Sequence, residues 1–377
     1  MISGKNMKRK ILVVFGTRPE AIKMCPLIDE LKKRESLECI VCLTGQHKEM
    51  LNQVMEVFQI KEDYNLNIMK SNQTVGDITI EVIKQLDYVL EEVNPDMILV
   101  HGDTTTSFAA ALAAFYKKIP VGHVEAGLRT GNKYSPYPEE MNRCLTSKLA
   151  TLHFAPTKQN AKNLEREGIS TGVYITGNTV IDSFKYTIKD NYSFENEILN
   201  EIDYSKRIIL LTAHRRENIG MPLINIFSAV KEIAKNNEDI IVVYPVHLNP
   251  SIREEAQKIL GKIENIRLIE PINVFDMHNL IKRCFLVLTD SGGLQEEAPA
   301  LGKPVLVLRH ETERPEAVLA GTVKIVGTEK DDIIIETQKL LDFEEYYLQM
   351  ANATSPYGDG LASKRIADLI IKNNETV

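Results

Sequence analysis

The stretch "VLTDSGGLQEEAPALGKPVLVL" (residues 287–308) decides the fold class. A short apolar run ends at Asp290, glycines make a turn, a helical pattern follows, and a second apolar run begins at Pro304. Strands that are separated by a helix run parallel, because the helix returns the chain to the edge where the first strand began. The continuous apolar character of both runs is typical of strands that are covered on both faces. We therefore expect a parallel α/β unit here.

The same alternation of short apolar runs and longer helical patterns extends along almost the whole chain. The first series of predicted strands covers residues 10–15, 38–43, 97–101, 120–125, 152–155 and 173–176. After an acidic, polar stretch, the second series covers residues 207–213, 239–245, 266–270, 285–290 and 304–309. We predict two doubly wound, Rossmann-like α/β domains that face each other across a cleft. The first is expected over residues 1–177, with a C-terminal helix at 361–377 that packs back onto it, and the second over 178–360.

Composition limits the classes of partner. The chain has 377 residues, enough for two domains that each bury a core. Its net charge of −7 gives no reason to expect nucleic acid or an anionic membrane as a partner. No apolar run approaches the roughly 20 residues that span a bilayer, and the N-terminal run is too short for a signal sequence. These features predict a cytoplasmic protein.

The cysteines do not form a recognisable framework. There are five, an odd number, and they are scattered along the chain. Cys39 and Cys42 have the C-x-x-C spacing, but they lie in an extended run, where residues three apart point to opposite faces of the strand. A redox pair would instead need a turn that opens a helix. We expect ordinary reduced thiols.

Unusual polar residues collect where the predicted strands of the first domain end, the edge at which open parallel sheets bind ligands. Arg18 and Lys23 follow the first strand near a helix start, either as solvated cations or as an anion grip. Asp103 follows the third strand, either as a helix cap or as a chemical group. Glu125 ends the fourth strand, and Glu139 opens the next helix, a common place for an acid. Three carboxylates on one rim shift one another's pKa values, which separates acid from base roles.

A metal site is the alternative for this rim. His101 and His123 stand two residues before Asp103 and Glu125, and residues two apart on a strand face the same way. No cysteine or histidine spacing of a known metal motif accompanies them, however. We expect no metal and no cofactor.

In the second domain the strand ends carry groups that suit phosphate. His214, Arg215 and Arg216 end its first strand, and His247 follows its second strand, either as a structural residue or as part of the site. The turn 291–293 lets backbone N–H groups approach a diphosphate closely, with a helix N-terminus behind them. It matches neither an ATP P-loop nor a dinucleotide fingerprint.

The residues beyond this turn suit a ribose. Glu296 or Glu297 lies within one helical turn of it and can accept both hydroxyls of the sugar. Arg314 begins a later Arg-Pro-Glu sequence that repeats the one at Arg18. A nucleotide sugar therefore fits, with its diphosphate on the second domain and its far end toward the carboxylates of the first.

Long motifs in a fixed order resemble the non-hydrolysing UDP-N-acetylglucosamine 2-epimerases of bacteria and archaea. They are "VFGTRPEAIKM", "TGQHKEM", "VHGDTTTS", "GHVEAGLRTGNKYSPYPEEMNR", "LTAHRREN", "VYPVHLNP", "TDSGGLQEEAP", "TERPEA" and "PYGDG". The resemblance covers nearly the whole chain. It implies the GT-B architecture, a homodimer, and reversible conversion of UDP-GlcNAc to UDP-ManNAc through 2-acetamidoglucal and UDP, without NAD or metal. It also implies supply of ManNAc for surface polysaccharides.

The resemblance further implies roles for individual residues. The acid and base residues are Asp103, Glu125 and Glu139, and His214 helps UDP to depart. UDP is bound by Arg18, Lys23, Ser291, Gly292, Gly293, Glu297 and Arg314. A second UDP-GlcNAc, an activator, is bound by Gln46, His47, Met50, Arg215 and His247. Three positions depart from relatives, of which the first two bear on the strength of activation: Glu49, Asn72 and Met277.

Three other functions remain as alternatives. A hydrolysing epimerase would release ManNAc and UDP, although the intact segments around Asp103 and His47 favour the non-hydrolysing type. A GT-B glycosyltransferase would need an acceptor. A nucleotide-sugar sensor would have no use for the three carboxylates.

Overall fold

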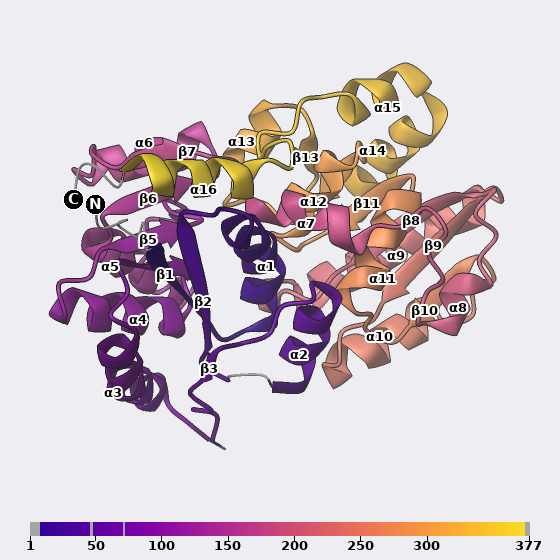
Figure 1. Cartoon of the computed structure of the whole chain (residues 1–377). Coiled ribbons are helices and arrows are strands. Elements are labelled where there is room, and N and C mark those ends of the chain that lie inside the picture. Colours follow the sequence, from indigo (N-terminus) through magenta and orange to yellow (C-terminus); the bar gives the residue numbers. More distant parts are fainter. Residues whose placement is uncertain (1–7, 46–47, 71, 374–377) are drawn as a thin grey trace, which may run out of the picture. The chain divides into compact units, whose positions relative to one another are not determined.

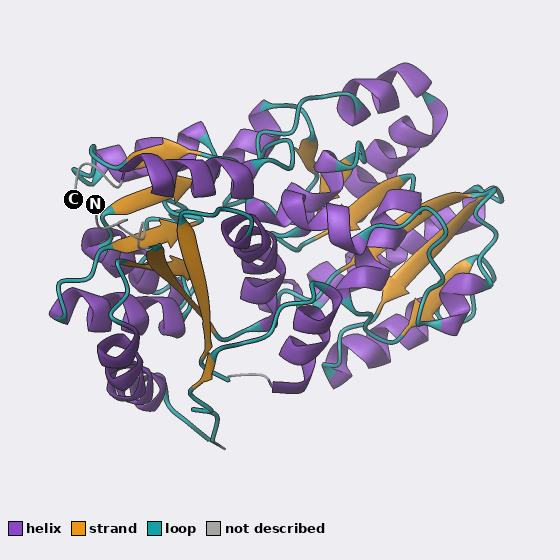
Figure 2. Cartoon of the chain, viewed as in Figure 1, coloured by secondary structure: helices purple, strands orange, loops and turns teal. Residues whose placement is uncertain are grey.

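The computed structural model describes residues 8–45, 48–70 and 72–373, which form two compact units (Figure 1). The first unit comprises Met1–Tyr186 together with Tyr357–Val377, and the second comprises Thr187–Pro356. Each has one sheet of parallel strands with helices between them, as Figure 2 shows. The predicted class, α/β with two doubly wound Rossmann-like sheets, is confirmed.

The first unit contains a seven-stranded sheet in the order β3-β2-β1-β4-β5-β6-β7. Its strands are β1 (Arg9–Phe15), β2 (Leu37–Leu43), β3 (Tyr64–Asn65), β4 (Met97–His101), β5 (Val121–Val124), β6 (Leu152–Ala155) and β7 (Val173–Ile175). Its helices are α1 (Arg18–Lys32), α2 (Lys48–Val57), α3 (Val75–Val93), α4 (Thr105–Tyr116), α5 (Glu139–Leu149), α6 (Lys158–Arg166), α7 (Thr179–Thr187) and α16 (Ala362–Lys372).

The second unit contains a six-stranded sheet in the order β10-β9-β8-β11-β12-β13. Its strands are β8 (Arg207–Thr212), β9 (Ile240–Pro245), β10 (Ile266–Ile269), β11 (Leu286–Thr289), β12 (Val305–Val307) and β13 (Val323–Ile325). Its helices are α8 (Glu197–Asn200), η1 (Arg216–Asn218), α9 (Met221–Asn236), α10 (Pro250–Leu260), α11 (Val274–Arg283), α12 (Leu294–Ala300), α13 (Pro315–Leu319), α14 (Lys330–Asp342) and α15 (Glu344–Ala351).

The strand order fixes where ligands can bind. In the first sheet the order reverses between β1 and β4, and in the second between β8 and β11. The loops that follow two such strands leave in opposite directions, which opens a crevice at their carboxyl ends. Arg18 begins the helix that follows β1, and Asp103 lies in the loop after β4; His214 and Ser291 lie in the loops after β8 and β11. Four of the predicted site residues therefore lie at the points where the strand order of each sheet reverses.

Both sheets are buried on their two faces, as the apolar strand runs predict. In the first unit the alanines of α4, from Ala109 to Ala114, are buried against the sheet, because their small side chains let the helix lie close to β1, β4 and β5. In the second unit Phe227 of α9 packs on Tyr244 of β9, with ring centroids 5.6 Å apart. Each unit thus has a core of its own.

The last helix belongs to the first unit. α16 packs against α1, and the two lie side by side in Figure 1. The Arg9 guanidinium donates to the Ile370 carbonyl at 2.6 Å, and Arg34 pairs with Asp368 at 2.8 Å. Asp182 of α7 accepts hydrogen bonds from the backbone N–H groups of Ala362 (3.1 Å) and Ser363 (2.8 Å). A side chain 180 residues away in sequence therefore caps this helix.

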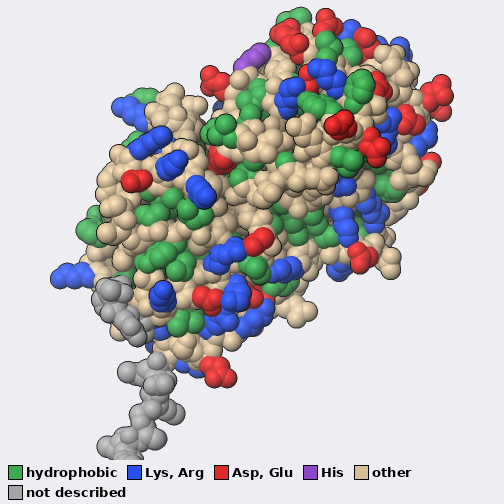
Figure 3. All heavy atoms as spheres, turned by 90° about the horizontal axis from the view of Figure 1, so that it is seen from above, with side chains coloured by type: hydrophobic (Ala, Val, Ile, Leu, Met, Phe, Trp, Pro, Cys, Tyr) green, Lys and Arg blue, Asp and Glu red, His purple; other side chains and the backbone are tan. Residues whose placement is uncertain are grey.

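Surface charge and thiols are unremarkable for such a fold. On the face drawn in Figure 3, acidic and basic side chains are interspersed rather than gathered into a field of one sign. All five cysteines are free thiols, and burial raises the pKa of Cys39 and Cys42 to about 12. No helix within the described parts of the chain is both long enough and apolar enough to cross a membrane.

Candidate active site

Glu20 joins the two helix starts at the reversal point of the first sheet. Thr17 caps α1, and the Glu20 carboxylate accepts the Thr17 backbone N–H (2.8 Å) in return, a capping box. Its other oxygen accepts the hydroxyls of Thr104 (2.7 Å), the cap of α4, and of Ser107 (3.2 Å). In the sequence Glu20 is only the last residue of the Arg-Pro-Glu sequence that begins at Arg18. The structure shows that it fixes the N-termini of α1 and α4 beside each other.

Arg18 stands at the first of these helix starts. It is half-buried, and burial lowers the pKa of its guanidinium. It makes no hydrogen bond or ion pair with any other described residue. A partly desolvated cation beside the free N–H groups of a helix is suited to an anionic ligand.

Glu125 is held ionised by three donors. The chain takes a left-handed conformation there (φ +61°), just after β5. Its Oε2 contacts the Lys23 ammonium, His101 Nε2 (3.2 Å) and the Asn178 amide (3.2 Å). Burial alone would raise the pKa of this carboxyl, but the charges and hydrogen bonds of Lys23 and His101 outweigh it and hold the pKa well below its usual value. Lys23, predicted to bind UDP, is thus also the counter-ion of a predicted acid/base group.

Asp103 is paired with an arginine that the sequence analysis did not single out. Its carboxylate contacts the Arg143 guanidinium, and its carbonyl accepts from the Asn142 amide at 3.0 Å. Both partners lie on α5, three and four residues after Glu139. Residues at that spacing share a helix face, so Glu139 opens the face of α5 that contacts Asp103.

The loop before α5 is organised by the neighbour of Glu139. Glu140 is buried and accepts the backbone N–H groups of Thr130 (3.0 Å) and Gly131 (2.9 Å), while Arg143 pairs with it at 3.0 Å. By contrast, the Glu139 carboxylate makes no hydrogen bond or ion pair with another residue in the described ranges. Glu140 therefore has a structural role, whereas the neighbouring Glu139 carboxylate has no partner among the described residues.

The rim does not have the composition of a metal centre. The described residues contain no group of three or more His, Cys, Asp and Glu side chains placed to hold a metal ion. His123 is fully buried on β5, with Nε2 2.7 Å from the Gly102 carbonyl, and burial lowers its pKa to about 3. It supports the turn that carries Asp103.

In the second unit, Asp290 holds the loop that carries His214. This fully buried carboxylate accepts the backbone N–H groups of His214 and Arg215, both at 2.8 Å, and the Asn218 amide at 3.0 Å. Its second oxygen lies 3.6 Å from His214 Nδ1. Burial lowers the pKa of His214 although Asp290 opposes the shift. The sequence identified Asp290 only as a strand end.

The glycine turn after β11 brings Arg314 against the backbone. A Cβ on Gly292 would lie 2.5 Å from Arg314 Nη1, so only glycine lets the guanidinium approach this closely. Arg314 also pairs with Glu296 at 2.6 Å. Glu296 is thereby committed to the arginine, and of the two candidate ribose ligands Glu297 faces the pocket.

A pocket of about 480 Å³ lies at the reversal point of the second sheet. Five predicted site residues line it: His214, His247, Ser291, Gly293 and Glu297. The His214 and His247 rings stack with centroids 5.5 Å apart. The Arg215 side chain turns instead to the Asp290 carbonyl, with Nε 3.3 Å from it. The volume and the mix of apolar wall and polar groups suit a small organic ligand.

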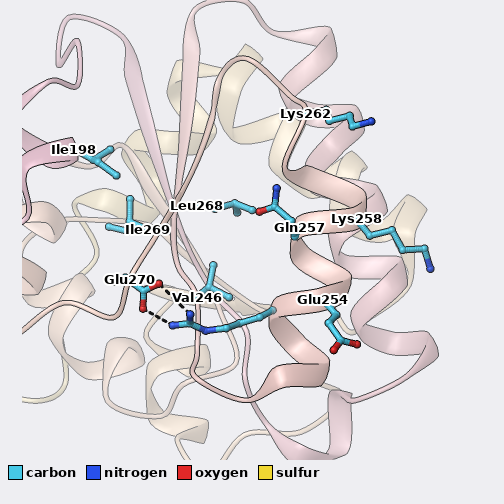
Figure 4. A pocket seen from close by; sticks show the side chains of 10 residues that line it. Ile198, Val246, Glu254, Gln257, Lys258, Lys262, Leu268, Ile269 and Glu270 are labelled. Carbon is cyan, nitrogen blue, oxygen red and sulfur yellow. Dashed lines mark hydrogen bonds and ion pairs between the residues drawn. The ribbon is translucent and has the colours of Figure 1, made fainter.

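A larger hollow in the same unit contains none of the predicted residues. It measures about 970 Å³ and lies between α10 and β10. In Figure 4, the side chains of Lys258, Lys262 and Glu254 point outward, away from the apolar residues of the hollow. One side is closed by an exposed ion pair between Arg253 and Glu270, in which two guanidinium nitrogens donate to the two carboxylate oxygens. Size alone therefore does not identify the site.

The structure describes the side chains of two of the five predicted activator residues. Gln46, His47 and the side chain of Met50 lie outside the described residues. Arg215 and His247 lie next to His214, one in the chain and the other by ring stacking. Met277, the departure noted in the sequence, lines the 480 Å³ pocket.

Comparison with known proteins gives one consistent result. The family model described as UDP-N-acetylglucosamine 2-epimerase matches residues 29–371. The UDP-N-acetylglucosamine 2-epimerase of Bacillus subtilis is 53% identical over 365 residues, covering 97% of this chain and 95% of that protein. The Escherichia coli K12 enzyme is 51% identical, covering 97% and 99%.

A solved structure agrees over the same length. The UDP-GlcNAc 2-epimerase of Neisseria meningitidis, crystallised with UDP-GlcNAc, superposes with a TM-score of 0.87 at 51% identity, covering 97% of this chain and 100% of that one. Similarity of this extent in both sequence and structure places the chain: it belongs to the UDP-N-acetylglucosamine 2-epimerase family.

Proposed function

We propose that this chain interconverts UDP-GlcNAc and UDP-ManNAc without hydrolysis. Family membership supports epimerase activity. The observation that carries the finer proposal is the pairing, in one chain, of three carboxylates at the strand ends of the first unit with a glycine-turn pocket in the second. A reaction that moves protons at a sugar while holding a nucleoside diphosphate needs both.

The second unit is proposed to hold UDP. The hydroxyl of Ser291, which lines the pocket, the backbone N–H groups of Gly292 and Gly293 and the charge of Arg314 suit the diphosphate. Glu297 suits the ribose hydroxyls. Arg18 supplies a further cation with no protein partner among the described residues. The neutral imidazole of His214, whose pKa is lowered, can donate one hydrogen bond to the departing diphosphate.

The first unit is proposed to move the proton. One basic carboxylate removes the proton at C2 of the sugar, the C1–O bond breaks, and UDP leaves with that electron pair, giving 2-acetamidoglucal. UDP then adds back at C1 as a proton is delivered to C2 from the other face. Two groups on opposite faces are required, and Asp103, Glu125 and Glu139 are the candidates. Glu125 has three fixed donors, whereas the Glu139 carboxylate makes no hydrogen bond or ion pair with another described residue.

An NMR time course in deuterated water tests this proposal. UDP-GlcNAc alone is expected to give UDP-ManNAc with deuterium at C2 of both sugars. Accumulation of free ManNAc and UDP would instead establish a hydrolysing epimerase. Absence of any turnover until an acceptor is added would point to a glycosyltransferase.

Two further proposals concern regulation and the use of the product. UDP-GlcNAc is proposed as an activator, bound partly by Arg215 and His247, so UDP-ManNAc alone should react slowly until a trace of UDP-GlcNAc is added. The product is proposed to supply ManNAc for surface polysaccharides.

A homodimer is proposed for the assembly of the chain. Large apolar side chains are exposed on α3, α4 and α5, which pack on one another in that order. They are Ile80, Tyr88, Phe115, Tyr116, Met141 and Leu145. Sedimentation at micromolar concentration should show twice the chain mass.

A further inference from the structure

We propose that His278 is a positioning residue for nucleotide recognition, and that it holds the carboxylate of Glu297 in place by a link that ends at Thr187. The inference rests on the proposed function, in which Glu297 receives the ribose. It extends that function to a buried residue that the sequence analysis did not single out.

His278 bridges two separate segments of the second unit. It lies on α11, fully buried. Its Nδ1 is 2.8 Å from the Thr187 hydroxyl, and its Nε2 is 3.4 Å from Glu297 Oε2. Thr187 is the first residue of the second unit, where the chain enters it from α7. The two ring nitrogens thus connect the pocket to the point where the chain enters the unit.

Glu297 is placed on both of its oxygens. Oε1 lies against the glycine turn, since a Cβ on Gly293 would be 3.2 Å from it. Oε2 faces His278. The side chain keeps 18% of its surface exposed and lines the 480 Å³ pocket. A neighbour on each oxygen limits the directions in which Glu297 can present its remaining lone pairs, and two adjacent hydroxyls of a ribose require one such direction.

The chemistry of the groups assigns the protons. A carboxylate only accepts, so the contact with Glu297 is attractive when Nε2 carries the hydrogen. In the neutral ring Nδ1 is then an acceptor, and the Thr187 hydroxyl donates to it. The threonine therefore selects the tautomer that holds the carboxylate, as a partner on one ring nitrogen sets the role of the other.

Neighbours of His278 on α11 make the same connection. Met277 lines the pocket. The Asn279 amide donates to the Thr187 carbonyl at 2.8 Å, and its oxygen accepts the Lys189 backbone N–H at 3.1 Å. Of three consecutive residues on this helix, the first thus lines the pocket, the second contacts Glu297, and the third binds the segment that begins at Thr187. A histidine that merely filled space would need neither polar contact.

A matched pair of variants tests the role of His278. Glutamine can place its amide N–H near the position of Nε2, and asparagine near that of Nδ1. His278→Gln therefore retains a donor for Glu297, whereas His278→Asn retains only the side toward Thr187. Both introduce a neutral amide into the same buried position, so damage to folding is similar.

The readout is discrimination between UDP and 2′-deoxy-UDP, measured by calorimetry on the full chain. The wild type should prefer UDP by about tenfold or more, as hydrogen bonds to an ionised carboxylate contribute, and Glu297→Gln should abolish most of that preference. His278→Asn should lose most of it too, and His278→Gln should keep it within about threefold. Thr187→Val, which leaves the pocket wall intact, should weaken it.

The outcomes separate the inference from the proposed function. Normal UDP binding with the same preference in His278→Asn as in the wild type would overturn the role of His278 alone. A wild type that binds UDP without preferring it to the deoxy form would also overturn it. Failure of the wild type to bind UDP at all would overturn the proposed function and this inference together.

Discussion

At the scale of single residues, buried carboxylates hold the loops from which the candidate site is built. Glu20, Glu140 and Asp290 each accept at least two backbone N–H groups in a loop or helix start. Buried N–H groups need such partners, since leaving one unpaired costs about 1–3 kcal/mol. Each of the three lies within two residues of a predicted site residue in the chain. Their part is to set the loop conformation rather than to meet the substrate.

Asp103→Asn should lower turnover by about 10²–10⁴-fold, the range typical of general acid–base catalysis. The amide keeps the shape of the side chain but cannot take up a proton or balance the charge of Arg143. UDP affinity should stay near the wild-type value, because UDP is assigned to other residues. Initial rates and calorimetry measure the two quantities.

Asp63→Asn is the matched control for this substitution. Asp63 accepts the Val41 backbone N–H at 2.8 Å elsewhere in the same sheet and has no proposed chemical role. Its turnover should remain within a few-fold of the wild type. If Asp103→Asn behaved in the same way, the assignment of Asp103 to proton transfer would be wrong.

The sequence was enough to predict which polar residues at strand ends belong to the candidate site. It was not enough to predict which side chains they contact. Asp103 and Glu125 were identifiable because they follow apolar runs that had to be strands. Arg143 was not identifiable, because its guanidinium meets Asp103 only after α5 has folded across from another loop. His278 gave no signal either, since a single histidine in a helical pattern is usually structural. Contacts between distant segments depend on packing that no local pattern encodes.

At the scale of elements, the strands that carry continuous apolar runs were predicted to within two residues. β4 and β6 have the predicted bounds. The edge strands β3 and β13 were missed, because two or three residues at the edge of a sheet need no apolar run. The start of α4 was open between Asp103 and a threonine, and Thr104 is the cap. That result leaves the Asp103 carboxylate free of a capping role.

Two buried histidines on β5 and β6 should make the first sheet sensitive to acid. His123 on β5 and His153 on β6 stand opposite each other in the sheet, and burial lowers the pKa of both, that of His123 to about 3. Between about pH 6.5 and pH 3 the unfolded chain binds a proton at His123 that the folded chain does not. The contribution of His123 to the free energy of unfolding is therefore fully present above about pH 6.5. It falls by about 1.4 kcal/mol for each pH unit below that value.

His123→Gln should reduce this loss. Glutamine can still donate to the Gly102 carbonyl but does not titrate. Between pH 7 and pH 5 the wild type should lose about 2 kcal/mol more than the variant. Urea unfolding at several pH values, followed by hydrogen exchange in peptides of β4 and β5, measures the difference. Equal pH dependence in the two proteins would show that His123 is not buried in its neutral form.

At the scale of the whole molecule, the first unit is discontinuous in sequence. The second unit is one segment, Thr187–Pro356, inserted before the last helix of the first. α16 must therefore dock on a unit from which it is separated by 170 residues of another fold. Ile366 and Ile370 are fully buried in that docked position, and Asp182 caps its first turn. The integrity of the first unit depends on this junction.

Asp182→Ala should destabilise the first unit by about 2 kcal/mol, because two backbone N–H groups of α16 lose a buried acceptor. Asp359→Ala is the matched control. Asp359 pairs with Arg365 of the same helix at 2.8 Å, but both side chains are about half exposed, so its loss should cost less than about 1 kcal/mol. Hydrogen exchange in denaturant resolves the units: peptides of α1 and α16 should lose protection in Asp182→Ala, while those of β8 and β11 keep it. Equal losses in the two variants would mean that capping by Asp182 does not anchor the helix.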